Sequence, residues 1–208
     1  MTEFWEKAFK DKQEMWGFSP AKSTLLVNNF FIKQNVKSVL IPGIGYGRNA
    51  KIFKDNGMNV TGIEISQTAI DLAQKHFGKD LTIYHGSVTE MPFDKNLYDG
   101  IYCYALIHFL DKKERGKFIQ DCLNQLTANG CMVFATISKK AQIYGHGTFI
   151  KKDRYELFSG LKMFFYDEES IQEEFSNAGL FDILEVDDVY PFYLIFCKKA
   201  SCPKIDLH

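Results

Sequence analysis

The sequence has little arginine and no excess of charge of either sign. Only three of its 25 basic residues are arginines, and its 26 acidic residues leave a net charge of −1. Binding to DNA or RNA depends on a clustered positive surface, and no basic stripe is visible along the chain. We therefore expect no nucleic-acid partner.

Long apolar runs and paired cysteines are also missing. The longest mainly apolar run, Ile101 to Leu110, is far shorter than the ~20 residues that a membrane span needs. Residues 1–10 are charged and aromatic and lack the apolar centre of a secretion signal. The five cysteines include no C-x-x-C pair, so the usual ligand spacing of a zinc site is missing. These absences predict a cytoplasmic protein with no membrane partner and no metal.

What the sequence does contain is an alternation of short β-like runs and amphipathic helical runs. Its 208 residues are 46% hydrophobic and include 19 phenylalanines, which fits one domain with a full core. Ser66, Asp111 and Asp167 stand where helix N-caps are expected. The predicted strands of the alternating part are 36–42, 59–65, 81–85, 98–104 and 131–137.

Two further strands are predicted near the end of the chain, at 181–189 and 192–197. Only Tyr190 and Pro191 separate them, and so short a connection cannot form a parallel crossover. The alternation before them is typical of a parallel sheet. The predicted fold class is therefore α/β: a Rossmann-like, doubly wound, mostly parallel seven-stranded sheet with an antiparallel C-terminal strand and helices on both faces.

The chain shows no internal repeat or linker, so residues 1–208 are expected to form a single domain. Residues 36–138 hold the alternating core. The aromatic segment 1–35, helical from about Ala21, is expected to cap the core, and 139–165 is expected to be an inserted lid. Residues 166–208 supply the last helix and the closing strand pair.

A glycine-rich turn follows the strand predicted at 36–42. In the run Gly43-Ile44-Gly45-Tyr46-Gly47, the glycines allow backbone N–H groups to approach a ligand. Glu64 ends the next strand, 21 residues after Gly43, where a carboxylate can reach the paired hydroxyl groups of a ribose. Together, the turn and the carboxylate predict a nucleoside site.

Each of these features has a simpler interpretation when it is taken alone. The turn can be a tight turn without a ligand, and Glu64 can be a solvated charge at a strand end. The fingerprint G-x-G-x-x-G of NAD-linked oxidoreductases is not matched, because Arg48 occupies its sixth position. The pattern G-x-G-x-G favours a smaller nucleoside without a pyrophosphate.

Four segments resemble the successive motifs of class I S-adenosylmethionine-dependent methyltransferases. They are VLIPGIGYGRNA at 39–50, VTGIEIS at 60–66, GSVTEMPF at 86–93 and the segment 98–110. The resemblance implies S-adenosyl-L-methionine as the cofactor and methyl transfer as the activity. The predicted closing strand pair agrees with the seven-stranded sheet of that family and its reversed seventh strand.

The resemblance also implies roles for individual residues. The implied cofactor-binding residues are Trp16 over the cofactor, Gly43, Gly45 and Gly47 along its methionine part, Glu64 at the ribose, Ile65, Ser87 and Val88 around the adenine, and Tyr102 beside the methyl donor. The leader segment around Trp16 is similar to those of small-molecule members such as thiopurine and tellurite methyltransferases, in which it folds over the cofactor.

Methyl transfer from a sulfonium needs alignment and exclusion of water, and a base only for some acceptors. Aromatic side chains stabilise a sulfonium by cation–π attraction, which makes Tyr104 a candidate catalytic residue. His108 follows the strand at 98–104 and is the candidate general base for a hydroxyl acceptor. A histidine packed under the next helix is an equally good interpretation.

The acceptor is expected to be a small molecule. The segment 102–105, Tyr-Cys-Tyr-Ala, stands where base-modifying members carry an N/D-P-P-Y motif, and the charge balance does not favour nucleic acid. Two alternatives stay open: a non-catalytic protein that binds S-adenosylmethionine, and an NAD-linked oxidoreductase. Neither the acceptor nor the oligomeric state is predicted.

Overall fold

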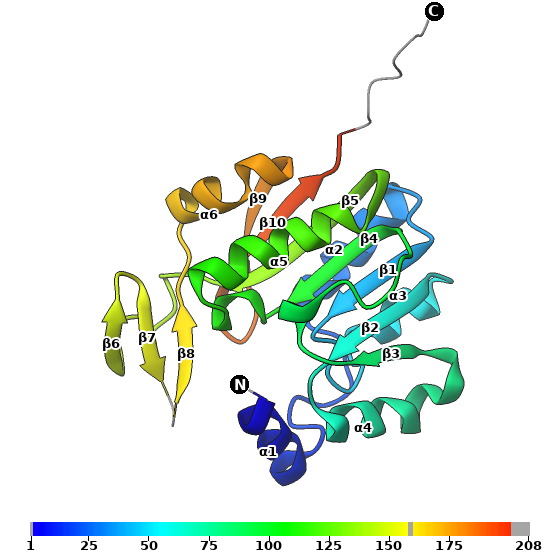
Figure 1. Cartoon of the computed structure of the whole chain (residues 1–208), viewed down its shortest axis with the longest axis horizontal. Helices are drawn as coiled ribbons and strands as arrows, with labels where there is room; N and C mark the ends of the chain where they lie inside the picture. The colour runs from blue at the N-terminus through cyan, green and yellow to red at the C-terminus, as the bar shows by residue number, and fades with distance from the viewer. Residues whose placement is uncertain (1, 158–159, 201–208) are drawn as a thin grey trace, which may run out of the picture.

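A computed structural model describes residues 2–157 and 160–200 of the chain. Its centre is a seven-stranded sheet with the strand order β3-β2-β1-β4-β5-β10-β9 (Figure 1). The strands are β1 (Ser38–Pro42), β2 (Asn59–Glu64), β3 (Thr82–His85), β4 (Tyr98–Tyr104), β5 (Leu126–Ile137), β9 (Leu180–Asp187) and β10 (Pro191–Lys198). Strands β1 to β5 pair in parallel, and β10 runs antiparallel to both β5 and β9. The predicted fold class is confirmed.

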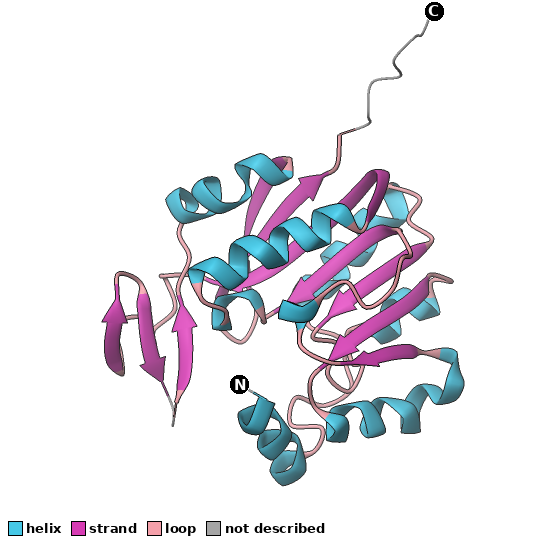
Figure 2. Cartoon of the chain, viewed as in Figure 1, coloured by secondary structure: helices cyan, strands magenta, loops and turns pink. Residues whose placement is uncertain are grey.

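Helices cover both faces of this sheet (Figure 2). The α-helices are α1 (Thr2–Lys12), α2 (Lys22–Lys33), α3 (Ala50–Asp55), α4 (Gln67–Phe77), α5 (Lys112–Asn124) and α6 (Glu168–Phe175), and the 3-10 helices are η1 (Gly78–Asp80), η2 (Val88–Glu90), η3 (Ile107–Phe109) and η4 (Ser176–Ala178). Phe31 of α2 and Phe53 of α3 are buried in the hydrophobic layer on one face. Phe118 of α5 and Phe175 of α6 are buried in the layer on the other. These four helices thus bury apolar residues against the sheet.

Three helices begin at the residues that the sequence predicts as caps. The Ser66 hydroxyl accepts a hydrogen bond from the backbone N–H of Ala69 at the start of α4. Asp111 opens α5 and Asp167 opens α6, each in a reciprocal capping box. Such caps satisfy N–H groups that have no partner inside the helix. The caps fix the residue at which each helix begins. They thereby fix the loops between strands and helices, and these loops border the candidate site.

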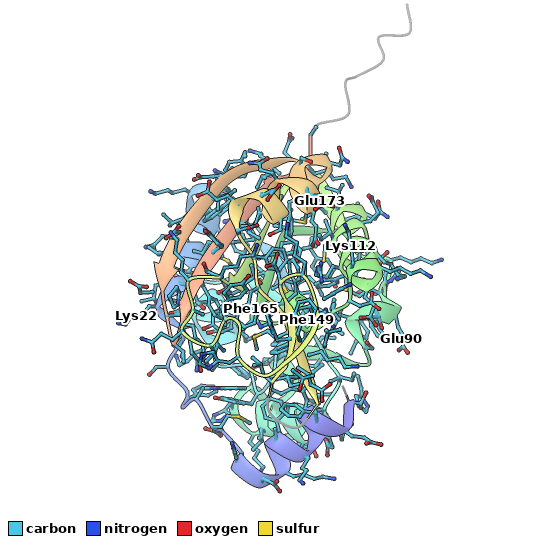
Figure 3. The ribbon with its side chains drawn as sticks, turned by 90° about the vertical axis from the view of Figure 1, so that its left-hand side faces the viewer. Lys22, Glu90, Lys112, Phe149, Phe165 and Glu173 are labelled. Carbon is cyan, nitrogen blue, oxygen red and sulfur yellow. The ribbon has the colours of Figure 1, made fainter. Side chains whose placement is uncertain are left out.

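Residues 139–165, for which the sequence predicts no regular elements, contain a separate antiparallel sheet. It consists of β6 (Thr148–Lys151), β7 (Arg154–Leu157) and β8 (Leu161–Phe164) and lies beside the main sheet (Figure 1). Phe149 on the outer strand is 65% exposed, whereas Phe165 is buried (Figure 3). Arg154 donates hydrogen bonds to the carbonyl oxygens of Phe109 and Leu110. These bonds attach the small sheet to the loop after β4.

The N-terminal segment contains a helix, α1, that lies before the helix expected from about Ala21. Its Glu6 carboxylate accepts hydrogen bonds from the Ser66 and Thr68 hydroxyl groups, each at 2.7 Å. These bonds lower the pKa of Glu6 to about 2. The carboxylate therefore stays charged at the N-terminus of α4, where the helix dipole favours a negative charge. This contact holds α1 next to the end of β2.

Two further findings concern membranes and metals. No helix in the described part of the chain is long and apolar enough to cross a membrane. Within residues 2–157 and 160–200, no group of three or more His, Cys, Asp or Glu side chains is arranged to hold a metal. Cys202 lies outside the described residues, and the other four cysteines are buried free thiols.

Candidate functional site

The carboxyl ends of β1, β2 and β4 border a cavity of about 540 Å³. This is the edge at which ligands bind in open parallel sheets. The cavity has a polar part near Gly45 and Glu64. Its lining also includes a mainly apolar group of side chains, and we call the space beside them the acceptor chamber: Tyr104, His108, Phe109, Ile137, Met163 and Phe192.

The glycine turn after β1 is held against the end of β2. The backbone N–H groups of Gly43 and Ile44 both donate to the Ile63 carbonyl oxygen, at 2.8 and 3.1 Å. Gly43 and Gly45 have φ angles of +71° and +58°, which residues other than glycine adopt at a cost. Both border the cavity.

Gly47 differs from the other two glycines of the turn. A Cβ atom on Gly47 would lie 2.5 Å from the Phe77 ring, and Gly47 does not line the cavity. Its small size serves the packing of the turn against α4. The contact between Gly47 and the cofactor that the resemblance implies stays a prediction.

Glu64 is 5% exposed, and its carboxylate borders the cavity. Its Oε2 atom accepts a hydrogen bond from the Gly45 N–H at 2.8 Å, and its Oε1 atom accepts from the N–H groups of Ile65 and Ser66, each at 2.9 Å. Burial raises the pKa of Glu64, while these three backbone donors oppose the rise. A carboxylate offers about four lone-pair sites. Oε2 therefore keeps one for a hydroxyl group in the cavity.

The residues expected around the adenine lie on one side of this carboxylate. Ile65, Ser87 and Val88 all line the cavity. The Ser87 hydroxyl caps η2 by accepting from the Thr89 N–H at 3.3 Å, and this fixes the loop after β3. The structure thus brings three predicted residues from two separate loops to one cavity.

Trp16 closes the cavity from the N-terminal side. Its ring stacks on Tyr46 at a centroid distance of 6.3 Å and an interplanar angle of 13°. Its backbone N–H donates to the Tyr46 hydroxyl, which itself donates to the Gly17 carbonyl oxygen at 2.8 Å. The leader is therefore pinned to the glycine turn, although Trp16 remains 47% exposed.

Tyr102 and Tyr104 share one face of β4 but have different surroundings. Tyr104 lines the cavity, and its hydroxyl donates to Asp188 at 3.4 Å. Tyr102 has no exposed surface, and its hydroxyl is hydrogen-bonded to that of Thr24 on α2 at 3.0 Å. Burial raises the pKa of both phenols. The structure brings Tyr104 to the site and leaves Tyr102 in the core beneath it.

His108 borders the acceptor chamber and is 2% exposed. Its Nδ1 atom lies 3.1 Å from the Thr136 hydroxyl oxygen and 3.4 Å from the Ile137 backbone nitrogen. Burial lowers the pKa of His108 to about 3. The ring is therefore neutral near pH 7.

Several residues that line the cavity were not predicted from the sequence. Met163 comes from β8, Phe192 and Tyr190 come from the start of β10 and the turn before it, and Arg48 lies at the glycine turn. The positions of Tyr190 and Phe192 could have been predicted from the short turn at Tyr190 and Pro191. An antiparallel strand that begins after this turn starts beside the carboxyl end of β5. Met163 lies in the segment 139–165 that was expected to form a lid, but nothing in the sequence singles it out, since its position depends on a sheet that was not predicted.

The fold and the site together define a class of protein. The order β3-β2-β1-β4-β5-β10-β9 with β10 reversed carries a glycine turn and an acidic strand end at one nucleoside-sized cavity. This combination is the Rossmann-like architecture of S-adenosylmethionine-dependent methyltransferases.

Comparisons with known proteins agree with this class. A family model described as a methyltransferase domain matches residues 40–134. The structure of 1,6-didemethyltoxoflavin-N1-methyltransferase from Burkholderia thailandensis, which contains 1,6-didemethyltoxoflavin and S-adenosylhomocysteine, has the same fold. Its TM-score is 0.75 at 16% identity, over 96% of this chain and 87% of that one.

Two curated relatives carry the name ubiquinone biosynthesis O-methyltransferase. The protein from Actinobacillus pleuropneumoniae serotype 7 is 29% identical over 116 residues, which cover 52% of this chain and 49% of that protein. The protein from Coxiella burnetii is 26% identical over 149 residues, covering 65% of this chain and 62% of that protein. The chain therefore spans about half of the first relative and about three fifths of the second. Residues 40–134 of this chain thus match a methyltransferase domain, and the chain as a whole is similar to class I S-adenosylmethionine-dependent methyltransferases.

Proposed function

We propose that this chain transfers a methyl group from S-adenosyl-L-methionine to a small-molecule acceptor in the acceptor chamber. One observation carries the proposal: a single cavity connects the anchored Glu64 carboxylate with the aromatic walls formed by Tyr104 and Phe192. A nucleoside at one end and an apolar molecule at the other can thus share one enclosed space. Enclosure and alignment are the main requirements of this transfer.

The residues of the polar part fit the cofactor in size and chemistry. Glu64 accepts hydrogen bonds from the ribose hydroxyl groups, Ile65 and Val88 pack on the adenine with Ser87 at its edge, and Gly43 and Gly45 leave room for the methionine part. Trp16 covers the cofactor from the leader. We retain Gly47 and Tyr102 as residues that support this arrangement from below, because neither lines the cavity.

When bound, S-adenosyl-L-methionine supplies a methyl group activated by a positively charged sulfur. The chain supplies orientation and a dry, aromatic environment. The ring of Tyr104 can stabilise a nearby positive charge, and its hydroxyl is held by Asp188. The walls formed by Phe109 and Met163 exclude water from the acceptor chamber.

Calorimetric titration tests the cofactor part of the proposal. We expect S-adenosylmethionine and S-adenosylhomocysteine to bind in the micromolar range and NAD not to bind. NAD carries a pyrophosphate, which the G-x-G-x-x-G fingerprint binds at a helix N-terminus. In this chain Arg48 occupies the position of the third glycine of that fingerprint. Tight binding of NAD with no binding of S-adenosylmethionine would contradict the proposal.

Turnover is tested separately with a panel of phenol, thiol and metalloid acceptors, with release of S-adenosylhomocysteine as the readout. We expect acceptor-dependent release with at least one aromatic member of the panel. A chain that binds the cofactor but releases product with none of them would instead be the non-catalytic binding protein.

Gly45→Ala tests the contact between the glycine turn and the cofactor. A Cβ atom at Gly45 would have only the Phe9 ring within reach, at 3.8 Å, so it would occupy space open to the ligand. We expect S-adenosylmethionine to bind about tenfold more weakly, together with a Tm loss of a few degrees from strain at φ +58°.

Gly57→Ala is the matched control. Gly57 has φ +78°, and a Cβ atom placed there would have nothing within 4 Å, but it follows α3 at the opposite end of the sheet from the site. It should lose a similar amount of Tm and keep its affinity. Equal loss of affinity in both variants would show that strain, and not contact, is responsible.

A further inference from the structure

The backbone around His108 determines where its ring carries a hydrogen atom. The β4–β5 ladder ends at the pair Tyr104 and Ala135, so the next N–H group on that edge, from Ile137, has no strand carbonyl to bond. It donates to Nδ1 of His108 at 3.4 Å instead. A backbone amide can only donate, so Nδ1 presents its lone pair. A neutral imidazole then carries its hydrogen on Nε2.

The other hydrogen bond at this ring agrees with that tautomer. The Thr136 hydroxyl lies 3.1 Å from Nδ1 and can donate to the same lone pair. With Nδ1 occupied and Nε2 already protonated, the ring has no free site for a proton. Burial, with no charged neighbour contributing, holds the pKa of His108 near 3. A general base must take up a proton near the working pH, so His108 is unsuited to that role.

The Nε2–H group remains available for a ligand. The hydrogen bonds of His108 to other described residues all involve Nδ1, and His108 lines the acceptor chamber. A hydrogen-bond acceptor on a bound molecule can therefore pair with this donor.

Tyr104 lines the same chamber and can act as a hydrogen-bond acceptor, whereas His108 acts as a donor. Its hydroxyl donates to Asp188 at 3.4 Å, and the Asp188 carboxylate is held in place by the Ser23 backbone N–H at 3.3 Å and by the Ser23 hydroxyl. A carboxylate only accepts hydrogen bonds. The Tyr104 proton is therefore directed at Asp188, and the Tyr104 oxygen keeps a lone pair that can accept a hydrogen bond.

Both groups lie next to one aromatic ring. The centroid of Phe192 is 6.1 Å from that of His108 and 5.8 Å from that of Tyr104. Ile137 and Met163 add apolar side chains to the lining of the same chamber. The chamber therefore offers one donor and one acceptor beside a flat apolar surface.

We propose that His108 is a hydrogen-bond donor that selects the methyl acceptor and takes no proton during the reaction. The acceptor molecule is then a flat ring with two polar groups. One hydroxyl group donates to the Tyr104 oxygen, and a second oxygen accepts from Nε2–H of His108. When the hydroxyl oxygen takes the methyl group and S-adenosylhomocysteine leaves, its proton passes to the Tyr104 oxygen as the Tyr104 proton moves to Asp188. This inference rests on the proposed methyl transfer and adds the class of acceptor to it.

The tautomer can be measured directly by NMR on protein labelled with ¹⁵N-histidine, with His108→Gln to assign the signal. We expect the Nε2–H form of His108 throughout the range from about pH 5 to pH 8. An Nδ1–H form, or protonation within this range, would overturn the proposal. This measurement needs no acceptor and is independent of turnover.

Selectivity is tested by calorimetry with catechol and phenol as probes, in the presence of S-adenosylhomocysteine. Catechol carries the second oxygen that His108 would contact, and phenol lacks it. We expect the wild type to bind catechol about tenfold more tightly than phenol. His108→Gln, which keeps a donor but is not basic, should retain most of this preference, whereas His108→Leu should abolish it without weakening phenol binding.

His146→Gln, which alters an exposed histidine in the loop before β6, is the control and should leave both affinities unchanged. Equal affinities for the two probes in the wild type, or a preference that survives in a folded His108→Leu variant, would overturn the assignment. Binding of S-adenosylhomocysteine in the same titrations would leave the cofactor site standing in either case.

Discussion

Glu64→Ala is expected to weaken the binding of S-adenosylmethionine by about 1–3 kcal/mol, or roughly 5- to 150-fold. The substitution removes the carboxylate that would accept from the ribose hydroxyl groups. It also removes the acceptor that holds the Gly45 N–H at 2.8 Å, so the glycine turn loses its tie to the end of β2. Calorimetric titration with S-adenosylmethionine measures the loss.

We expect the loss of affinity to depend on the position of the Glu64 carboxylate and not on the number of negative charges in the cavity. Glu90→Gln provides the matched control, because Glu90 also lines the cavity but its side chain is exposed. It should bind the cofactor as the wild type does. Glu64→Gln should resemble Glu64→Ala, since its NH₂ group would face a backbone N–H donor. Wild-type affinity in either Glu64 variant would refute the ribose contact.

The core of the fold was predictable because its signals are local. Helix caps such as Ser66 and Asp111 act within one turn of their own helix. The two-residue connection at Tyr190 and Pro191 permits only an antiparallel pair. The glycine turn and Glu64 are coupled through neighbouring parallel strands, so their meeting follows from strand order alone.

The features that the sequence could not predict depend on contacts between distant segments. Tyr102 and Tyr104 lie two residues apart on β4, so their side chains point to the same face of the sheet. Helix α2 distinguishes them, because it brings Thr24 over Tyr102. Gly47 matches the motif in spacing, yet Phe77 of α4 occupies the space above it. Where a helix from another part of the chain will pack is not encoded in the local pattern.

The segments around the site depend on distant contacts in the same way. Helix α1 is held by Glu6, whose partners lie 60 and 62 residues away. The tautomer of His108 depends on an amide 29 residues further along the chain. A sequence pattern identifies the residue types of such a site, but the proton positions that set its chemistry follow from tertiary contacts.

A buried ion pair joins α5 and α6 behind the acceptor chamber. Arg115 has 1% of its side chain exposed and donates to the Glu174 carboxylate through both Nε and Nη2, the shortest contact being 2.6 Å. It also donates to the Leu110 carbonyl oxygen and lies 4.1 Å above the Phe164 ring. Tyr166 donates a further hydrogen bond to Glu174 at 2.8 Å.

Arg115→Met is expected to lower the free energy of unfolding by about 3–5 kcal/mol, because it leaves the Glu174 carboxylate largely buried without its cation. Urea denaturation measures this loss. Lys112→Met is the matched control, since its pair with Glu173 joins the same two helices at the surface (Figure 3) and should contribute nothing measurable.

The double variant Arg115→Met/Glu174→Met distinguishes two contributions to the free energy of unfolding: the penalty for burying an unpaired charge and the stabilisation that the ion pair provides. Replacing both partners by apolar side chains removes the unpaired charge, so it should be more stable than Arg115→Met alone. Tyr166 would then lose its acceptor, and the recovery should therefore be incomplete. The contrary outcome is a double variant whose loss of unfolding free energy equals the sum of the losses in Arg115→Met and Glu174→Met. The two side chains would then act independently, and their ion pair would not be what joins α5 to α6.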